Sequence, residues 1–290
     1  MKFRIIRYFL TFCTIIFGHY SYAQLMNIDS CLVILKTAKD DTNKVMLLDA
    51  IAWEISYSSL QKGIDYSNQS YNLAKKLNYE RSYARIFNTQ AAIYTDMAEI
   101  PMALDFCLEG LKYAKKHNQL RGQVSLYNSL GNIYSKRKDS KKSLYYYLQS
   151  VAVAKICQPD ILPVAAYGNI VGIYTGYKKL DSAMYYANLC LDYNLKNNNK
   201  DRLSNNYISL SEIYYELKDK DKCFKAATDA VNASIAINDD YTLAHCYIQL
   251  SNAHYLNKNL KLAIEALDKA TICVKKTGDI PALETIAEYY

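Results

Sequence analysis

The sequence predicts an all-α protein, a solenoid of about six helical hairpins followed by half of a seventh. Apolar residues recur with helical spacing, the pattern repeats every 40 residues, and matching positions of the copies are consistently small or consistently large. Within residues 127–154, Tyr127, Leu130, Gly131 and Tyr134 fall at i, i+3, i+4 and i+7 on one helical face. A single hairpin of this kind cannot bury its apolar faces alone, so stacked copies are required.

Columns of equivalent residues define the expected contacts. Two columns are small throughout, which indicates close helix packing, because a large side chain there would cost roughly 1–3 kcal/mol. The small columns are Gly63, Ala103, Ser143, Ala183, Cys223 and Ala263, and Ser70, Gly110, Ser150, Cys190, Ala230 and Ala270. Two large columns are expected to fill the core between hairpins. They are Ile64, Leu104, Leu144, Met184, Phe224 and Ile264, and Glu54, Tyr94, Tyr134, Tyr174, Tyr214 and His254.

This order of positions resembles the tetratricopeptide repeat (TPR), which implies a right-handed solenoid that binds a protein or peptide. The residues that carry the resemblance are Tyr127, Leu130, Gly131, Tyr134, Ser143, Tyr147 and Ser150. It covers about residues 45–290, although Ile51 and Val171 replace the consensus Gly in two copies. The period is 40 rather than the usual length of about 34 residues, which predicts extended second helices.

Residues 1–23 are expected to be a secretory signal peptide, because Lys2, Arg4 and Arg7 precede an apolar run and Ala23 ends a small-x-small pattern. The protein is therefore expected to be exported, to the periplasm. Residues 24–44 are expected to form a capping helix and a linker.

The TPR array is expected to occupy residues 45–290. Its predicted hairpins are 45–79, 85–117, 125–157, 165–197, 205–237 and 245–276, with a half repeat at 280–290. Ile286, Ala287 and Tyr290 fit the Leu, Gly and Tyr offsets if the last connection is four residues shorter than the others. The apolar face of this half repeat needs a cover, and self-association is one predicted way to supply it.

The sequence contains no motif for catalysis or for a cofactor: G-x-G-x-x-G, the P-loop, H-E-x-x-H and G-x-S-x-G are all missing. His245 and His254 are not spaced to place two metal ligands on one helical face, and His254 is assigned to packing. The cysteines are scattered without a C-x-x-C, so most should be small buried apolar residues, while a disulfide or redox role stays open. We therefore expect no enzyme activity, no metal and no cofactor.

The formal net charge of +7 falls to +4 after the predicted cleavage, which removes three basic residues. The basic residues are spread over turns and helix ends, so a solvated face is favoured over a nucleic-acid site. A membrane partner is expected only if the signal segment stays uncleaved or the chain is cut short before a membrane helix.

The candidate binding site is the inner face of the first helices, which lines the concave peptide groove in the TPR family. Transferring this face by register gives Arg85, Asn88, Thr95, Asn128, Asn132, Ser135, Asn205, Glu212, Tyr215, His245, Asn252 and Tyr255. Asn side chains can bond both the N–H and the C=O groups of an extended peptide, whereas ordinary helix-surface polarity is the alternative interpretation. The Lys and Arg residues of TPRs that clamp a carboxylate have no counterparts here, which argues against a chaperone-tail receptor. The matching positions hold Asn88, Ala92, Asn128, Ser129, Ala165 and Asn169.

The sequence thus predicts an exported, non-enzymatic TPR scaffold that binds a protein or peptide in its groove. Asp40 to Glu54 also resembles the opening of exported TPR sensor regions in Bacteroidetes-type histidine kinases and transcriptional regulators. The alternative is therefore the sensor portion of a longer or truncated signal-transduction protein, a two-component kinase or a regulator, whose output domain is absent from this chain.

Overall fold

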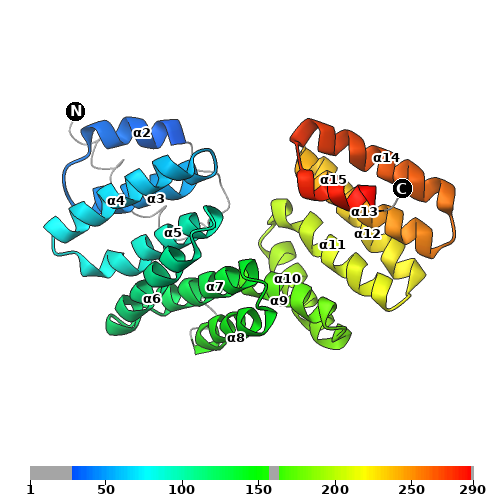
Figure 1. The fold of residues 1–290 in the computed structure, drawn as a ribbon, viewed down its shortest axis with the longest axis horizontal. Coiled ribbons are helices and arrows are strands. Elements are labelled where there is room, and N and C mark those ends of the chain that lie inside the picture. Colours follow the sequence, from blue (N-terminus) through cyan, green and yellow to red (C-terminus); the bar gives the residue numbers. More distant parts are fainter. Residues whose placement is uncertain (1–27, 157–162, 289–290) are drawn as a thin grey trace, which may run out of the picture. The chain divides into compact units, whose positions relative to one another are not determined.

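The computed structural model describes residues 28–156 and 163–288, so the predicted signal peptide lies outside the described residues. Within these ranges the chain forms fourteen α-helices, α2 to α15, with one short 3-10 helix and no strand (Figure 1). The predicted all-α class is confirmed. The chain divides into two units, residues 1–79 and 80–290, which are described separately.

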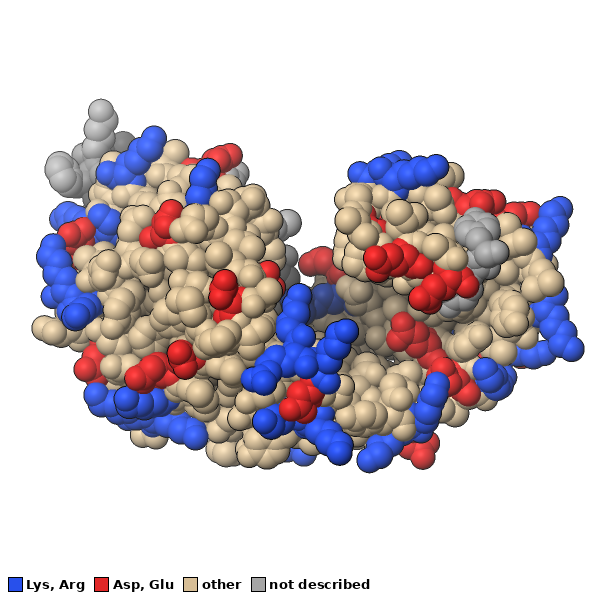
Figure 2. Space-filling view, in the orientation of Figure 1, with Lys and Arg blue, Asp and Glu red and all other residues tan. Residues whose placement is uncertain are grey.

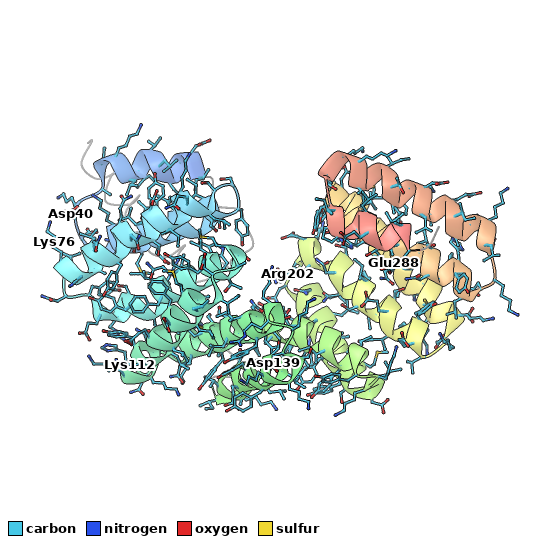
Figure 3. The ribbon with its side chains drawn as sticks, viewed as in Figure 1. Asp40, Lys76, Lys112, Asp139, Arg202 and Glu288 are labelled. Atoms are coloured by element: carbon cyan, nitrogen blue, oxygen red, sulfur yellow. The ribbon has the colours of Figure 1, made fainter. Side chains whose placement is uncertain are left out.

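The first unit contains one hairpin preceded by a short helix. Its described elements are α2 (Ile28–Thr37), α3 (Thr42–Ser56) and α4 (Leu60–Lys76). Asp41 caps α3 by accepting hydrogen bonds from the N–H groups of Asn43 and Lys44, so α3 begins at Thr42, before the predicted hairpin start at residue 45. Asp40 pairs with Lys76 at 3.1 Å, which ties the residues before α3 to the end of α4 (Figure 3).

The second unit contains five hairpins and a final single helix. Its elements are η1 (Glu80–Ser82), α5 (Tyr83–Asp96), α6 (Ile100–Lys116), α7 (Leu120–Lys136), α8 (Ser140–Ile156), α9 (Val164–Gly176), α10 (Leu180–Lys196), α11 (Lys200–Glu216), α12 (Lys220–Ala236), α13 (Asp240–Leu256), α14 (Leu260–Thr277) and α15 (Ile280–Ala287). Each odd-numbered helix from α5 to α13 packs against the helix that follows it. With the hairpin of the first unit, these make the predicted six hairpins and a half.

Residues in the left-handed backbone conformation follow the ends of the helices at regular intervals. At the α7–α8 turn, Lys138 has a φ of 59°, and its N–H donates to the carbonyl of Ser135 at 2.8 Å. The N–H of Asp139 donates to the carbonyl of Tyr134 at 2.9 Å, which completes a Schellman motif. In the described ranges positive φ recurs every 20 residues on either side of the gap at 157–162, at Asn78, Ala98, Asn118 and Lys138 and then at Lys178, Asn198, Lys218, Asn238, Lys258 and Gly278. The 40-residue period is therefore two similar steps of a helix and a short turn.

These steps bear on two predictions about the hairpins. The length of the period is not in the second helices alone, because α4, α6, α8, α10 and α12 have 17 residues each and the first helices α7 and α11 also have 17. The first helices also begin earlier than predicted, α7 at Leu120 and α13 at Asp240 instead of residues 125 and 245. Their first turns are largely polar, so apolar spacing gave no signal for them.

The last helix keeps the register of the array. Gly278, with a φ of 72°, ends α14 where Asn ends α4, α6, α10 and α12. The carboxylate of Asp279 accepts a hydrogen bond from the N–H of Ala282 at 3.2 Å. Ile286, which is buried, therefore occupies the position of Cys246 one repeat earlier. The predicted four-residue shortening is wrong, because α15 starts 40 residues after α13.

All residues of the two small columns are buried, as predicted. Their hydroxyl groups also bond the partner helix: Ser143 donates to the carbonyl of Gly131 at 2.9 Å, and Ser150 donates to that of Val124 at 2.8 Å. The large columns differ from the prediction at the end of the array, where Phe224 and Ile264 are 40% and 52% exposed. Ile264 is exposed because α15, which has 8 residues, covers only part of α14.

Candidate functional site

The inner face is defined here as residues 85, 88, 89, 92 and 95 of α5 and the positions 40, 80, 120 and 160 residues later. First helices of successive hairpins lie side by side, α5 beside α7 and both α9 and α13 beside α11, so their stripes adjoin. Lys, Arg, Asp and Glu side chains are interspersed over the face of the molecule that Figure 2 shows. The inner face differs from that pattern, since most of its polar side chains are amides and hydroxyls.

Hydrogen bonds link the polar side chains of α5, α7 and α9. Ser129 Oγ donates to Asn88 Oδ1 at 2.8 Å, and Asn169 Nδ2 donates to Asn132 Oδ1 at 3.1 Å. Asn169 Nδ2 also lies 3.5 Å from Asn128 Oδ1. The Nδ2 groups of Asn128 and Asn132 have no partner in the described part of the chain, so they can donate to carbonyl oxygens of a ligand.

Tyr147 of α8 fixes the orientation of Asn132. Its hydroxyl donates to Asn132 Oδ1 at 2.8 Å, and burial raises the pKa of Tyr147, which keeps this donor protonated. The ring passes directly over Gly131, where an added Cβ would overlap ring atoms. The Gly of the TPR pattern therefore serves the inner face indirectly, because it lets Tyr147 reach Asn132.

A second set of linked polar groups joins α11 and α13. Gln249 Nε2 donates to Glu212 Oε1 at 3.1 Å, and Asn252 Nδ2 donates to Gln249 Oε1 at 3.5 Å. Burial raises the pKa of Glu212 to about 7, so this carboxyl is partly neutral at physiological pH. The ammonium nitrogen of Lys218 lies 4.5 Å from the centroid of the Tyr215 ring. Tyr255 is 60% exposed.

Glycine occupies part of the inner face of α9. Gly168, Gly172 and Gly176 are exposed, and an added Cβ at any of them would meet nothing within 4 Å. Gly168 and Gly172 occupy the inner-face positions that hold Asn128 and Asn132 on α7. The backbone of α9 is therefore accessible where the neighbouring helices carry side chains.

Several predicted site residues lie outside the linked sets. His245 Nε2 contacts Asp279 Oδ2 at 2.8 Å, so it joins α13 to the cap of α15. Asn205 is exposed, and Arg85 is half-buried. The hydroxyl of Thr95 donates to the carbonyl of Ala91 within its own helix, at 2.6 Å. Ser135 is exposed.

Sequence reasoning missed Asn169 and Gln249 as members of the site, although they make most of the links. With Ser129 they share one register position, directly after the position of Asn88. The signal that could have found them is the polar character of this column on helices that must also pack together.

The described cysteines are packing residues. Cys31, Cys107, Cys190, Cys223, Cys246 and Cys273 are free and buried, whereas Cys157 lies outside the described residues. Burial raises the pKa of the Cys107, Cys190 and Cys246 thiols to about 12, so little thiolate forms at neutral pH. The packing role predicted from the sequence is confirmed for these six.

Other candidate sites are weak. His254 packs its ring 5.2 Å from that of Phe224, and burial lowers its pKa, in line with the predicted packing role. In the ranges 28–156 and 163–288, no group of three or more His, Cys, Asp or Glu residues is arranged to hold a metal ion. An open depression on α6, lined by Asp105, Leu108, Glu109 and Lys112, involves one helix and no inner-face residue.

None of the described helices combines the length and apolar character needed to cross a membrane.

No protein-family model matches the sequence, and a comparison with curated proteins also gives no match. Solved structures are similar in fold. BtubC (BKLC) from P. vanneervenii superposes with a TM-score of 0.66 at 16% identity, over 76% of this chain and 93% of that one. The signal-transduction ATPase PH0952 from Pyrococcus horikoshii, which has a tetratricopeptide repeat sensor, gives 0.63 at 16%, over 89% of this chain and 42% of that one. A Rap protein complexed with Competence and Sporulation Factor gives 0.62 at 13%, over 90% and 77%.

At these identities the likeness concerns the fold. The chain is a helical-repeat solenoid, in agreement with its 40-residue sequence period. More specifically, its fold is that of a TPR solenoid, as the residues of the repeat predicted. The chain spans 42% of the length of the Pyrococcus ATPase, which contains further parts.

Proposed function

We propose that this protein is an exported, non-enzymatic scaffold that binds an extended peptide, or an extended segment of a protein, along its inner face. The observation that carries the proposal is the linked row of amide side chains on α5, α7 and α9, with Nδ2 groups of Asn128 and Asn132 left unpartnered in the described structure. An extended peptide presents alternating N–H and C=O groups, and side-chain amides can bond both.

The physical basis of binding is preorganisation. Asn132 is held by Tyr147 and Asn169, and Asn88 is held by Ser129, so their orientations are set before a ligand arrives. A receptor that is already ordered loses little conformational entropy on binding. Each hydrogen bond then contributes about 0.5–1.5 kcal/mol net.

Two further observations support parts of the proposal. The Rap protein of similar fold was crystallised with Competence and Sporulation Factor, which supports ligand binding by this type of solenoid. The basic and apolar pattern of residues 1–23 supports export.

The sensor alternative also has an observation in its favour. The Pyrococcus ATPase of similar fold carries its tetratricopeptide repeats as a sensor. In both versions the inner face binds the ligand, and they differ in whether binding is passed to another domain.

The proposal is tested by selecting peptides from a random displayed library on the purified chain and measuring their affinities for two variants. Asn128→Ala with Asn132→Ala removes the free donors, and we expect affinity to fall roughly thirty-fold at two hydrogen bonds of about 1 kcal/mol each. Asp105→Ala with Lys112→Ala on α6 is the matched control and should leave affinity unchanged. Peptides that bind both variants as tightly as the unaltered chain would show that the inner face is not the binding surface.

A further inference from the structure

Glu212 is an acidic side chain on the inner face that forms no ion pair with any described residue. Its Oε1 accepts the hydrogen bond from Gln249, and it has no other partner in the described structure. The next acid on the same helix, Glu216, is paired with Lys178. Removing a carboxylate from water without a compensating cation is costly, and burial alone accounts for the raised pKa of Glu212.

The charged groups on the surrounding elements are engaged elsewhere. Lys178, in the turn before α10, pairs with Glu216, and Lys222 of α12 pairs with Asp219 at 2.9 Å. On α13, His245 contacts Asp279, and the ring of His254 packs against Phe224 on α12. Lys218, which follows α11, lies over the ring of Tyr215. None of these groups neutralises Glu212.

The surface beside Glu212 is open toward α9. The equivalent position on that helix is Gly172, and no atom lies within 4 Å of the place where its Cβ would stand. On the other side, Gln249 holds one carboxyl oxygen of Glu212 and is itself bonded by Asn252. The second carboxyl oxygen is thus left for a ligand, at a place where the equivalent residue of α9 has no side chain.

We propose that Glu212, supported by Gln249 and Asn252, is a subsite for a positively charged nitrogen of the bound ligand, either a Lys or Arg side chain or the amino terminus of a peptide. This inference rests on the proposed function and specifies the chemistry of its ligand. A cation placed against the free carboxyl oxygen supplies the positively charged partner that Glu212 lacks in the described structure. It also selects for a basic segment even though the chain itself carries a net charge of +7.

Binding at this subsite is coupled to a proton. At low pH the cation meets a neutral carboxyl group, which must release its proton to the solvent before the ion pair forms. With a pKa of about 7, affinity for a cation should be roughly thirty-fold weaker at pH 5.5 than at pH 8. A neutral ligand should show no such dependence at this position.

The test follows the carboxyl signal of Glu212 by NMR in the full chain with carbon-13-labelled glutamate, and Glu212→Gln assigns the signal. The probes are n-butylammonium and n-butylguanidinium for the two side chains, glycinamide for an amino terminus, and n-butanol as the neutral control. We expect at least one cation to lower the titration midpoint of Glu212 and n-butanol to leave it unchanged. Whichever cation acts identifies the source of the charge. Glu216→Gln, on the same helix, should retain the effect.

The subsite is overturned if none of the cations moves the titration midpoint of Glu212. That result is separable from a failure of the proposed function. Peptides that still bind the inner face while the cations have no effect would remove the subsite and leave the scaffold. Cations that shift Glu212 while no selected peptide binds the chain would remove the scaffold and leave the cation site.

Discussion

Two buried serines at helix contacts differ in whether their hydroxyl groups are satisfied. Ser150 donates to the carbonyl of Val124 at 2.8 Å, whereas the hydroxyl of Ser204 is fully buried without a hydrogen-bond partner in the described structure. Ala84 and Ala244 occupy the position of Ser204 in two other hairpins. An unmet buried hydroxyl costs about 1–3 kcal/mol, and a satisfied one contributes about 1 kcal/mol.

We therefore predict opposite effects for the same substitution at these positions. Ser204→Ala should raise the free energy of unfolding by about 1 kcal/mol, and Ser150→Ala should lower it by about 1 kcal/mol. Urea unfolding followed by circular dichroism measures both. If both variants were destabilised, the hydroxyl of Ser204 would have to be satisfied in solution.

Glu212 should make stability depend on pH. Its pKa rises from about 4.5 in the unfolded chain to about 7 in the folded one, so between these values the folded chain holds the extra proton. Stability therefore decreases as pH rises through this window, by at most about 3 kcal/mol, and levels off above it. Glu212→Gln should remove this dependence, so the variant should be more stable than the unaltered chain at pH 8 and similar at pH 4. Parallel stability curves for the two proteins would contradict the raised pKa.

At the scale of single helices, two glycines that lie one register position apart on the first helices α7 and α9 are expected to respond in opposite ways to the same substitution. Gly131 lies under the ring of Tyr147, whereas a Cβ at Gly172 would meet nothing within 4 Å. Gly131→Ala should lower the free energy of unfolding by roughly 1–3 kcal/mol through overpacking. Gly172→Ala should raise it by roughly 0.5–1 kcal/mol, because alanine favours the helix.

Thermal unfolding of the two glycine variants measures this contrast. In a solenoid the folding free energies of the repeats and of their interfaces add, so a local change shifts the melting temperature of the whole array. Destabilisation by Gly172→Ala would mean that α9 packs differently from the arrangement described.

The helices of this chain were predictable from apolar spacing, but their ends were not. Column positions such as Ser143 and Ser150 are fixed by close contact, so their small size is visible in the sequence and the structure confirms their burial. Helix ends are set by left-handed residues, and Lys138 and Lys178 carry no general signal for that conformation as glycine does. The register of α15 depends on the turn at Gly278, and the apolar residues Ile286, Ala287 and Tyr290 fit a different register by spacing alone.

Across the second unit, the inner face was only partly predictable. Its linked polar groups include five residues that transfer by register gave as groove candidates, namely Asn88, Asn128, Asn132, Glu212 and Asn252. Their partners on adjacent hairpins are about 40 residues away in sequence, so the links depend on stacking geometry that no local pattern contains. The contact of His245 with Asp279 depends likewise on the placement of α15.

For the whole molecule, export remains a prediction from residues 1–23. We expect the protein expressed in its native cell to begin at Gln24, because cleavage follows Ala23 in the small-x-small pattern. Intact-mass measurement of the secreted or periplasmic fraction tests this. A cytoplasmic protein that retains Met1 would contradict it.

Hydrogen exchange of the chain with and without a selected peptide tests most directly whether the ligand binds along the first helices. Binding on the inner face should slow exchange in the first helices α5, α7, α9, α11 and α13 and leave the second helices α6, α8 and α12 unchanged. Protection confined to second helices, or to the surface around Lys112, would contradict an inner-face binding site.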